Sequence, residues 1–521
     1  MALFQALDVS RSTRSKRDAL VHFIRHADPL ESAYTIKALR GEKIAQGIPT
    51  RLLKQIAHHH FPTHSWIFDA CYGAVGDLSE TLSILCSDAQ REPELSRPLI
   101  VAWFNSIGQM RAGSDDTFVR TLHAFLTDLS RDESFLFLKL STGGFRVGVS
   151  RNLVHDAIAQ TTGIARSVID ERLMGPFPTH PTWLNELTKP VTLAEQHASP
   201  LPFLLAHTWQ DALQTTLDLN GLQIEYKWDG IRCQLIKTSQ WTRLWSRGDQ
   251  DITEQFPEII EATAQLPTGL VLDGEILIQR EGKLGTFQDL QTRINRKRIT
   301  KTLLNTHPAI FRPYDCLRLS GEDLRSQPLH VRRNRLESLP IAVSPVLQAK
   351  NWTELAELRT SAAEHDAEGL MLKSVDGVYT GGRKAGLWWK WKLDPMTADC
   401  VLIYAQAGHG RRASIHSDFT LAVFDHDQLV PVAKAYSGLS DAELKEADRW
   451  IRAHTIEKFG PVRRVQPQLV FEIAFEGIAR SSRHKSGLAL RFPRIVRWRR
   501  DADVTDADQL SHLESLLDSR Q

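Results

Sequence analysis

The chain has 521 residues, with 64 lysines and arginines against 62 aspartates and glutamates, so its formal charge is +2. A chain of this length is expected to form about three domains. Hydrophobic residues make up 42% and charged residues 24%, which excludes a largely disordered protein. No apolar run approaches the roughly 20 residues of a membrane-spanning helix, so we expect no membrane association.

Cysteine usage and the start of the chain both bear on the cellular compartment. The five cysteines are scattered and none belongs to a C-x-x-C pair, so neither a disulfide framework nor a four-cysteine zinc site is expected. The opening residues lack the basic and then apolar layout of a secretory signal. A reducing compartment is therefore expected. The near-neutral total charge does not decide whether nucleic acid binds, because the local distribution of charge does.

Residues 1–175 are predicted to form a helical N-terminal domain. Between Thr117 and Leu129 the apolar residues recur on one helical face, and Ser150 is placed to cap a helix that runs through Ala159. The glycine-rich stretch 141–148 lies before that helix. On its residues alone, an ordinary loop between helices is the favoured interpretation.

A proline-rich stretch, 176–204, is predicted to be a linker, since six prolines fall between residues 174 and 203. Residues 205–395 then mix short β-rich runs with helical ones, which predicts an α+β domain. The expected elements are one helix and five strands: Thr253–Gln265, Leu222–Glu225, Cys233–Ile236, Thr242–Trp245, Leu270–Leu272 and Glu275–Gln279.

The last segment, 396–521, is predicted to be mostly strands. A small β-barrel of the oligonucleotide-binding (OB) type fits this count of strands around one helix. The expected strands and helix are Cys400–Tyr404, Phe419–Phe424, Val470–Ala474, Ile495–Trp498 and the helix Asp441–Phe459.

The strongest signal for chemistry is the stretch 225–232, which reads E-x-K-x-D-G-x-R. It lies where a predicted strand meets a turn. A lysine beside acids at a strand end is also typical of exposed ion pairs, which contribute little to stability. By itself, Lys227 fits both a surface ion pair and a nucleophile.

Further sets of residues follow this stretch at ordered intervals. Some contain an acid at the end or the start of a predicted strand, and one has an aromatic residue before an acid. In another, lysines alternate with tryptophans, so the lysines share one strand face. These sets are Ser246-Arg247-Gly248, Leu272-Asp273-Gly274-Glu275, Pro313-Tyr314-Asp315, Glu368-Gly369-Leu370-Met371-Leu372-Lys373, Trp389-Lys390-Trp391-Lys392 and Arg491-Phe492-Pro493-Arg494.

In type and order, these sets resemble the motifs of ATP-dependent DNA ligases, which belong to the covalent nucleotidyltransferases. The resemblance covers the whole chain. It implies a helical DNA-binding domain at 1–175, an adenylation (nucleotidyltransferase) domain at 205–395 and an OB-fold domain at 396–521. It also reverses the interpretation of 141–148, because Arg146 then lies in a segment similar to one that contacts DNA. Residues 202–206 and 388–392 are similar to a bacterial subgroup.

The resemblance also implies a role for each site residue. Lys227 would be the nucleophile that attacks the α-phosphate of ATP and forms lysyl-AMP. The other residues would bind the nucleotide or the metal. Arg232 and Glu275 would hold the ribose, Glu225 would lie beside the base and Tyr314 would stack on it. Arg247, Lys390 and Lys392 would neutralise phosphate charge, Arg494 would orient pyrophosphate, and Glu368 with Glu275 would bind Mg²⁺ or Mn²⁺.

The implied reaction seals a 5′-phosphate/3′-hydroxyl nick in duplex DNA through lysyl-AMP and then a DNA-adenylate, with release of pyrophosphate and AMP. Two basic runs, 293–301 and 491–500, would contact the duplex backbone without reading bases. The expected DNA contacts are Arg146, Arg293, Arg296 and Arg298. A monomer in the bacterial cytoplasm, at the nucleoid, serving replication, repair and recombination, is the expected setting.

Two positions depart from the family pattern. Gly386 stands where relatives usually carry an arginine, and the lysine that often follows the last basic motif is missing after Arg500. Three alternatives also stay open. An RNA ligase or capping guanylyltransferase would share the K-x-D-G core but generally lacks the helical domain. An NAD-dependent ligase would carry a four-cysteine module. A non-catalytic nick-binding protein would not need Lys227, Glu275, Glu368 and Lys392 intact.

Overall fold

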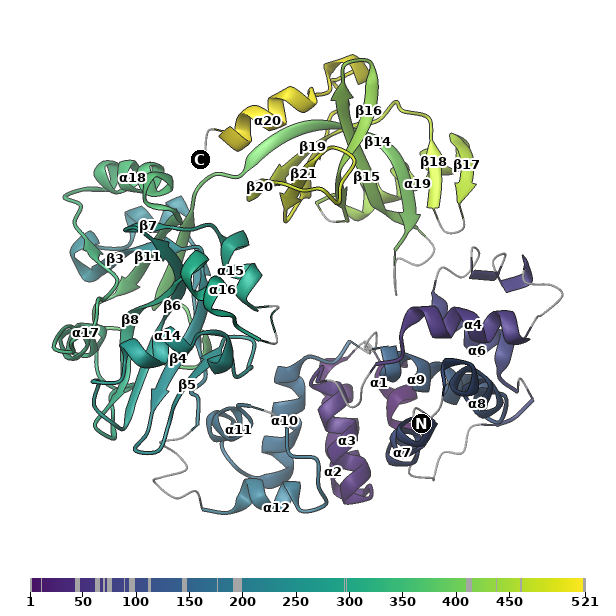
Figure 1. Cartoon of the computed structure of the whole chain (residues 1–521), viewed down its shortest axis with the longest axis horizontal. Helices are drawn as coiled ribbons and strands as arrows, with labels where there is room; N and C mark the ends of the chain where they lie inside the picture. The colour runs from purple at the N-terminus through teal and green to yellow at the C-terminus, as the bar shows by residue number, and fades with distance from the viewer. Residues whose placement is uncertain are drawn as a thin grey trace. The chain divides into compact units, whose positions relative to one another are not determined.

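The computed structural model (Figure 1) describes most of the chain. The described residues are 2–10, 12–42, 47–60, 66–68, 71–72, 77–88, 90–92, 99–110, 114–142, 148–175, 177–190, 199–294, 296, 298–408, 415–436, 438–459 and 462–518. They fall into two compact units, one with residues 43–145 and 394–521 and the other with 2–42 and 146–393. Within the described residues, no helix is long and apolar enough to cross a membrane.

The N-terminal region is helical, as expected. Ser150 accepts a hydrogen bond from the backbone N–H of Leu153, so the predicted capping residue acts as an N-cap. Ser114 caps α8 in the same way, through the N–H of Thr117. The helices are α1 (Ala2–Val9), α2 (Thr13–His26), α3 (Pro29–Leu39), α4 (Thr50–His60), α6 (Leu78–Cys86), α7 (Leu99–Met110), α8 (Asp115–Thr127), α9 (Arg131–Thr142), α10 (Arg151–Thr162) and α11 (Arg166–Arg172).

Helices from the two ends of this region pack together within one unit. Helix α10 packs against α2, and Lys16 Nζ donates to the carbonyl of Gly148 at 3.2 Å. Arg40, just after α3, donates to the carbonyl of Leu173 at 2.8 Å. Residues 2–42 and 148–175 therefore form one helical layer although about a hundred residues separate them in sequence.

The stretch predicted as a linker contains a helix. Helix α12 (Trp183–Thr188) lies within 176–204, and the side chain of Trp183 is 1% exposed. Its ring packs on Phe177, with 5.2 Å between ring centroids. Proline content alone missed this helix, because a large aromatic side chain can bury enough surface to fix a short turn of helix.

Two antiparallel-rich sheets follow, in the same unit as α10. The first has the order β10-β3-β11-β13-β2 and the second has the order β5-β4-β6-β8-β9, with β7 paired to β6. Their strands are β2 (His207–Thr208), β3 (Leu222–Trp228), β4 (Ile231–Lys237), β5 (Thr242–Ser246), β6 (Leu270–Arg280), β7 (Lys283–Leu284), β8 (Ala309–Leu319), β9 (Glu322–Asp323), β10 (Val346–Leu347), β11 (Ala367–Ser374) and β13 (Trp388–Lys392). A small pair, β1 (Leu204–Leu205) and β12 (Gly382–Arg383), lies beside them.

Strand β6 joins two segments that were predicted separately. Gly274 lies between them, and a Cβ atom there would meet the ring of Phe311 at 2.6 Å. Glycine therefore lets strand β8 approach β6 closely instead of ending the strand. The predicted helix 253–265 is likewise shorter, a 3₁₀ turn at Thr253–Gln255 followed by α14 (Pro257–Ala262).

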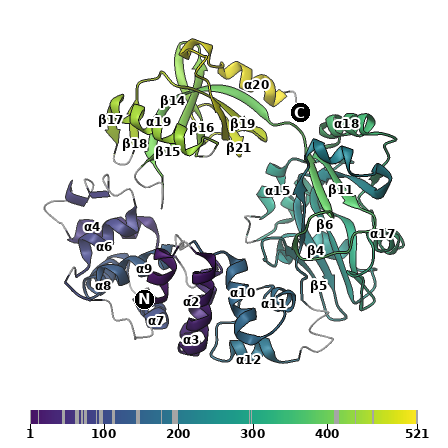
Figure 2. The same ribbon diagram turned by 180° about the vertical axis from the view of Figure 1, so that it is seen from behind.

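Three helices pack against strands of the second sheet. Helices α14 and α17 (Leu329–Glu337) pack against β8, and α15 (Phe287–Ile294) packs against β6 (Figure 2). Leu235, Leu272 and Ile276 enter the core under these helices. The neighbouring residues Arg232, Asp273 and Glu275 point to the opposite face because side chains alternate along a strand.

A buried carboxylate ties the helical layer to the sheets of the same unit. Asp249 follows β5 in the left-handed conformation, with φ of 63°. It accepts a hydrogen bond from the backbone N–H of Gly175 and pairs with Arg151 at 3.3 Å and Arg40 at 3.6 Å. The turn 246–249 is thus fixed to residues from both segments of the helical layer.

The C-terminal region is rich in strands. Strands β14 (Met396–Ala407), β15 (His416–Asp425), β16 (Gln428–Ala435), β17 (Thr455–Phe459), β18 (Val462–Val465), β19 (Val470–Phe475) and β22 (Arg494–Trp498) form one sheet, and β20 (Gly477–Arg480) pairs with β21 (Leu488–Arg491). Helix α19 (Asp441–Ala453) lies among them, and α20 (Leu510–Asp518) ends the described chain.

The predicted end of the helix in this region was wrong. Helix α19 begins with a capping box between Ser440 and Glu443, as its sequence allows, but it ends at Ala453. The next residues, Thr455–Phe459, form strand β17 against β18. Thr455 and Ile456 are β-branched, and strand pairing decides their conformation over helical periodicity.

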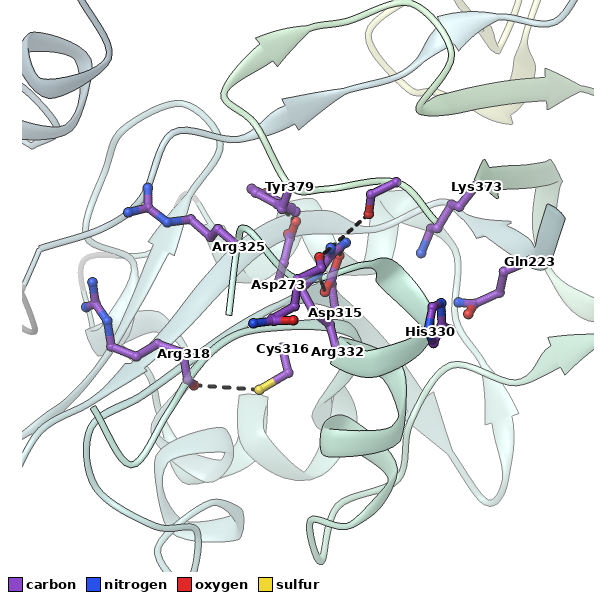
Figure 3. A network of polar contacts seen from close by, with 12 residues as sticks. Gln223, Asp273, Asp315, Cys316, Arg318, Arg325, His330, Arg332, Lys373 and Tyr379 are labelled. Atoms are coloured by element: carbon purple, nitrogen blue, oxygen red, sulfur yellow. Dashed lines mark hydrogen bonds and ion pairs between the residues drawn. The ribbon is translucent and has the colours of Figure 1, made fainter. Parts of the chain in front are cut away.

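We expect the substitution Arg332→Met to lower the free energy of unfolding of the region around the two sheets by about 3–5 kcal/mol, because it leaves the buried Asp315 carboxylate without a counter-charge. Arg332 binds both oxygens of Asp315, at 2.8 and 2.9 Å, and both side chains are 0% exposed (Figure 3). Urea unfolding followed by tryptophan fluorescence would measure the change.

Arg280→Met serves as the matched control, since Arg280 pairs with Asp289 at 2.9 Å but is 47% exposed. Such a surface pair contributes about 0–1 kcal/mol. Equal unfolding midpoints for the two variants would contradict the expectation.

Candidate active site

Strand register places the predicted site residues on one face of the first sheet. In β3 the residues Gln223, Glu225 and Lys227 share this face. Across the ladder, Lys373 pairs with Gln223 and Met371 with Glu225 in β11, and the next strand, β13, places Trp388, Lys390 and Lys392 opposite Lys373, Met371 and Gly369. The first motif and the tryptophan–lysine motif therefore meet although 160 or so residues separate them.

A β-bulge brings Glu368 onto the same face. The register between β3 and β11 shifts between Ala367 and Leu370, so two residues lie opposite Lys227. Gly369 has φ of 134°, and a Cβ atom there would lie 2.2 Å from the carbonyl oxygen of Trp391. Glycine is required at this point, and the bulge it permits turns the Glu368 carboxylate toward Lys227.

Lys227 and Lys392 share one carboxylate oxygen. Lys227 Nζ lies 2.9 Å from Glu368 Oε2, and Lys392 Nζ lies 3.1 Å from the same atom. Burial raises the pKa of Glu368, but the charge of Lys227, hydrogen bonding and the charge of Lys392 outweigh it and lower that pKa to about 2. Lys227 and Glu368 stay 21% and 20% exposed, so the amine can be reached by a ligand.

Glu275 contributes a second carboxylate from the other sheet. Burial raises the pKa of Glu275 to about 8, against the opposing charges of Lys227 and Arg232. Lys227 therefore lies within electrostatic reach of two acids, one from each sheet. The two acids differ in proton affinity because Glu368 has two lysines beside it and Glu275 is more deeply desolvated.

Arg232 is held in a buried hydrogen-bond network. Its Nε and Nη2 donate to Asp273 at 3.1 and 2.7 Å, and its other bonds reach the Leu204 carbonyl at 2.7 Å and the Tyr379 hydroxyl at 3.4 Å. These bonds use four of the five N–H donors of a guanidinium group. One donor is left for the ribose contact that the sequence predicts, and that contact stays a prediction.

Asp273 is the centre of this network, and the sequence assigned it no role. It also accepts from the hydroxyl of Tyr314 at 3.2 Å. The hydroxyl of Tyr379, which lies near Asp273 in Figure 3, donates to it at 2.7 Å. A carboxylate that is 0% exposed must have such partners. The sequence feature that could have identified Asp273 is its position next to Gly274 inside an otherwise apolar strand, since a buried acid there needs hydrogen-bond partners.

Tyr314 and Arg247 lie near this network. The Tyr314 ring is 8% exposed, and Lys373 Nζ lies 4.3 Å from its centroid. Arg247 is exposed in the turn after β5, and its backbone N–H donates to the Arg232 carbonyl at 3.0 Å. Stacking of Tyr314 on a base and contact of Arg247 with phosphate stay predictions.

The remaining predicted residues fall elsewhere. Arg494 begins β22 in the other unit and lies 3.7 Å from Glu476. Arg146 lies outside the described residues. Arg296 and Arg298 are exposed beyond α15, as a contact with a nucleic-acid backbone requires.

Arg293 does not fit its predicted role as a DNA contact. Its side chain is 0% exposed and binds both oxygens of Glu258, at 2.7 and 3.0 Å. It also donates to the carbonyls of His307 and Gln255. The basic run therefore begins with an internal ion pair, because Arg293 lies on the core side of α15.

The carboxylates fit a divalent cation that is held together with a nucleotide. Mg²⁺ is usually bound by one or two carboxylates plus phosphate oxygens and water, which matches Glu275 and Glu368 beside the Lys227 amine. Among the described residues, no set of three or more His, Cys, Asp or Glu side chains forms a preassembled metal cage.

Comparison with known proteins shows that all three parts of the chain are similar to parts of DNA ligases. Family models match residues 203–392 (ATP dependent DNA ligase domain), 412–502 (ATP dependent DNA ligase C terminal region) and 1–159 (DNA ligase N terminus). A probable DNA ligase of Koribacter versatilis is 32% identical over 484 residues, covering 87% of this chain and 83% of the relative. A DNA ligase of Natronomonas pharaonis is 30% identical, covering 78% and 75%.

The solved structure titled Pmar-Lig_Pre. has a TM-score of 0.64 and covers 96% of this chain and 98% of its own, at 17% identity, which shows a shared fold. Fold and site together define an enzyme of the ligase class. The chain belongs to the ATP-dependent DNA ligase family.

We expect Gly369→Ala to lower the rate of covalent nucleotide transfer at least about a hundredfold, because its Cβ atom would collide with the Trp391 carbonyl and displace Glu368 from Lys227. Label incorporated from α-labelled ATP would measure the rate. Gly221→Ala is the control, since a Cβ atom there meets nothing within 4 Å and its φ is not positive. Similar rates for both variants would show that the bulge does not position the acid.

Proposed function

We propose that Lys227 of this ATP-dependent DNA ligase accepts AMP from ATP, transfers it to the 5′-phosphate of a nick in duplex DNA, and so enables the 3′-hydroxyl to close the strand. The observation that supports this most directly is the position of Lys227 and Lys392 on one oxygen of Glu368. A partly exposed amine, a second cation and a carboxylate are thereby gathered at the end of β3.

In the first step the Lys227 nitrogen attacks the α-phosphorus of ATP. An N–P bond forms, the bond to the bridging oxygen breaks, and pyrophosphate leaves. Glu368 is too weakly basic, at a pKa of about 2, to be an efficient proton acceptor at neutral pH, so its part is to orient the amine. Lys390 and Lys392 lie on the same strand face and would offset charge on the phosphates.

Glu275 and Glu368 are the residues proposed to hold Mg²⁺ or Mn²⁺ with the ATP phosphates. When bound, such an ion neutralises phosphate charge in the transition state. The raised pKa of Glu275 supports this assignment, because a desolvated carboxylate gains most from a cation. Glu225, Arg232, Arg247 and Tyr314 are proposed for the base, the ribose and the phosphates.

The domain functions proposed from sequence are DNA binding at 1–175, adenylation at 205–395 and an OB-fold at 396–521. The ranges matched by the three family models support this order. The antiparallel strands β14, β15, β16, β18 and β19 support a small barrel in the last segment. Arg494 would act there on pyrophosphate.

The proposed partner is nicked double-stranded DNA, bound by a monomer through backbone contacts. Arg296 and Arg298 are exposed and basic, and Arg146 lies in the segment proposed to contact DNA. Replication and repair roles are typical of this family. A location in the bacterial cytoplasm, at the nucleoid, remains part of the proposal.

Wild-type protein should take a stable label from α-labelled ATP with Mg²⁺, and Lys227→Ala should abolish it, because the nucleophilic nitrogen is gone. Nicked duplex DNA should discharge the label. Lys350→Ala, at an exposed position, should label normally. Label from α-labelled GTP instead would favour a capping enzyme, and nick binding without label, even after pyrophosphate treatment, would favour a non-catalytic protein.

Replacing both Arg296 and Arg298 with alanine should weaken binding to nicked duplex and lower the slope of log K against log salt by roughly 2, since each lost phosphate contact removes about 0.9. Fluorescence anisotropy over a salt series would measure it. Arg335→Ala removes an exposed arginine from α17 and should leave the slope unchanged. An equal slope in the double variant would exclude these two residues from the DNA path.

A further inference from the structure

A buried polar trio lies beside the site and has no part in the phosphate chemistry. Lys373 Nζ lies 2.5 Å from Glu225 Oε1, and Gln223 Nε2 donates to the same oxygen at 2.7 Å. The side chains of Lys373 and Glu225 are 2% and 1% exposed. Figure 3 shows Lys373 and Gln223 beside each other.

Stability does not explain why a charged pair is buried here. Removing two charges from water costs free energy that their attraction repays only in part, and apolar replacements of such pairs are often neutral or stabilising. The pair holds both members in place, however. Lys373 Nζ lies 4.3 Å from the ring centroid of Tyr314 and 4.6 Å from that of Trp388, so two aromatic rings fix the ammonium group.

The trio faces the space that the nucleotide is proposed to occupy. Glu225 is two residues before Lys227 in β3, so the two side chains point to the same face. The Lys373 ammonium group and the Gln223 side-chain amide both donate to Oε1 of Glu225, which fixes the carboxylate plane from one side. Burial lowers the pKa of Lys373, and the Glu225 charge opposes that change.

We propose that Lys373 and Gln223 are positioning residues that hold the Glu225 carboxylate in place as the acceptor for the 6-amino group of adenine, so that the enzyme selects ATP over 6-oxo purine nucleotides. The inference rests on the proposed function. A carboxylate without a proton can only accept hydrogen bonds. Adenine presents an amino donor at position 6, whereas a 6-oxo purine presents an acceptor there.

The size of the effect follows from the burial of the trio. A site that leaves a buried polar group unpaired with the wrong substrate can discriminate by a factor of 10⁴ or more. Once the Lys373 contact is gone, Glu225 can rotate away from the position in which it accepts a hydrogen bond from a 6-amino group. Selectivity should then fall, while Lys227 keeps its own partners.

The test compares ATP with inosine triphosphate, which carries a 6-oxo group, as α-labelled donors of the covalent label. In Lys373→Met the ratio of kcat/KM for the two nucleotides should fall at least about tenfold, chiefly through a higher KM for ATP. Glu225→Gln combined with Lys373→Met removes both buried charges, and its amide can donate to the 6-oxo group. That double variant should therefore use inosine triphosphate better than the wild type does.

Lys237→Met is the matched control. Lys237 is also buried, and it donates to the carbonyls of Thr263 and Ala264, but it lies on the face of β4 opposite Arg232. The ratio of kcat/KM for ATP and inosine triphosphate in Lys237→Met should equal that of the wild type. Thermal melting would identify variants that fold, and if Lys373→Met does not fold, the double variant decides.

An unchanged nucleotide ratio in a folded Lys373→Met protein and in the double variant would overturn the inference. Failure of the proposed function looks different, because the wild type would then take no label from either nucleotide, even after pyrophosphate treatment. A wild type that labels from ATP while the variants keep its selectivity overturns only the role of Lys373 and Gln223.

Discussion

The antiparallel register of β3, β11 and β13 is the constraint on which the site depends. Three strands that are distant in sequence bring two lysines to within hydrogen-bond distance of one acid. A slip of one residue would turn every one of these side chains to the other face. The bulge at Gly369 adds the one irregularity that the arrangement needs, since a regular ladder would point Glu368 away from Lys227.

The second sheet contributes Glu275 and a buried hydrogen-bond network that makes the site rigid. Asp273 receives hydrogen bonds from Arg232, Tyr314 and Tyr379, which come from three different strands or loops. Because the buried carboxylate is satisfied only when all three are in place, the network resists small displacements. Residues that touch the nucleotide in the proposed function are thus held by residues that do not, as in the pair of Glu225 with Lys373.

Sequence reasoning found the reacting residues more readily than the supporting ones. Lys227, Glu368 and Lys392 stand in short motifs, and the structure brings them together. Asp273 and Lys373 stand in the same motifs, yet their partners are fixed by tertiary packing and cannot be read from spacing. Arg293 looked like part of a basic surface because charge alone does not reveal which side of α15 faces the core. The end of α19 at Ala453 was likewise decided by pairing of β17 with β18.

The packing of α2 against α10 has a consequence for how the chain is made. These helices join residues separated by more than a hundred positions, as the bond from Lys16 to Gly148 shows. During synthesis the first helices leave the ribosome long before the helices that pack on them. The apolar faces of the first helices therefore stay exposed to solvent until about residue 175 has been synthesised. Closing so long a loop also costs entropy that local contacts cannot repay at once. The slow step in acquiring this layer should therefore be the meeting of the two segments, with the turn at Asp249 locking the result once the later strands have formed.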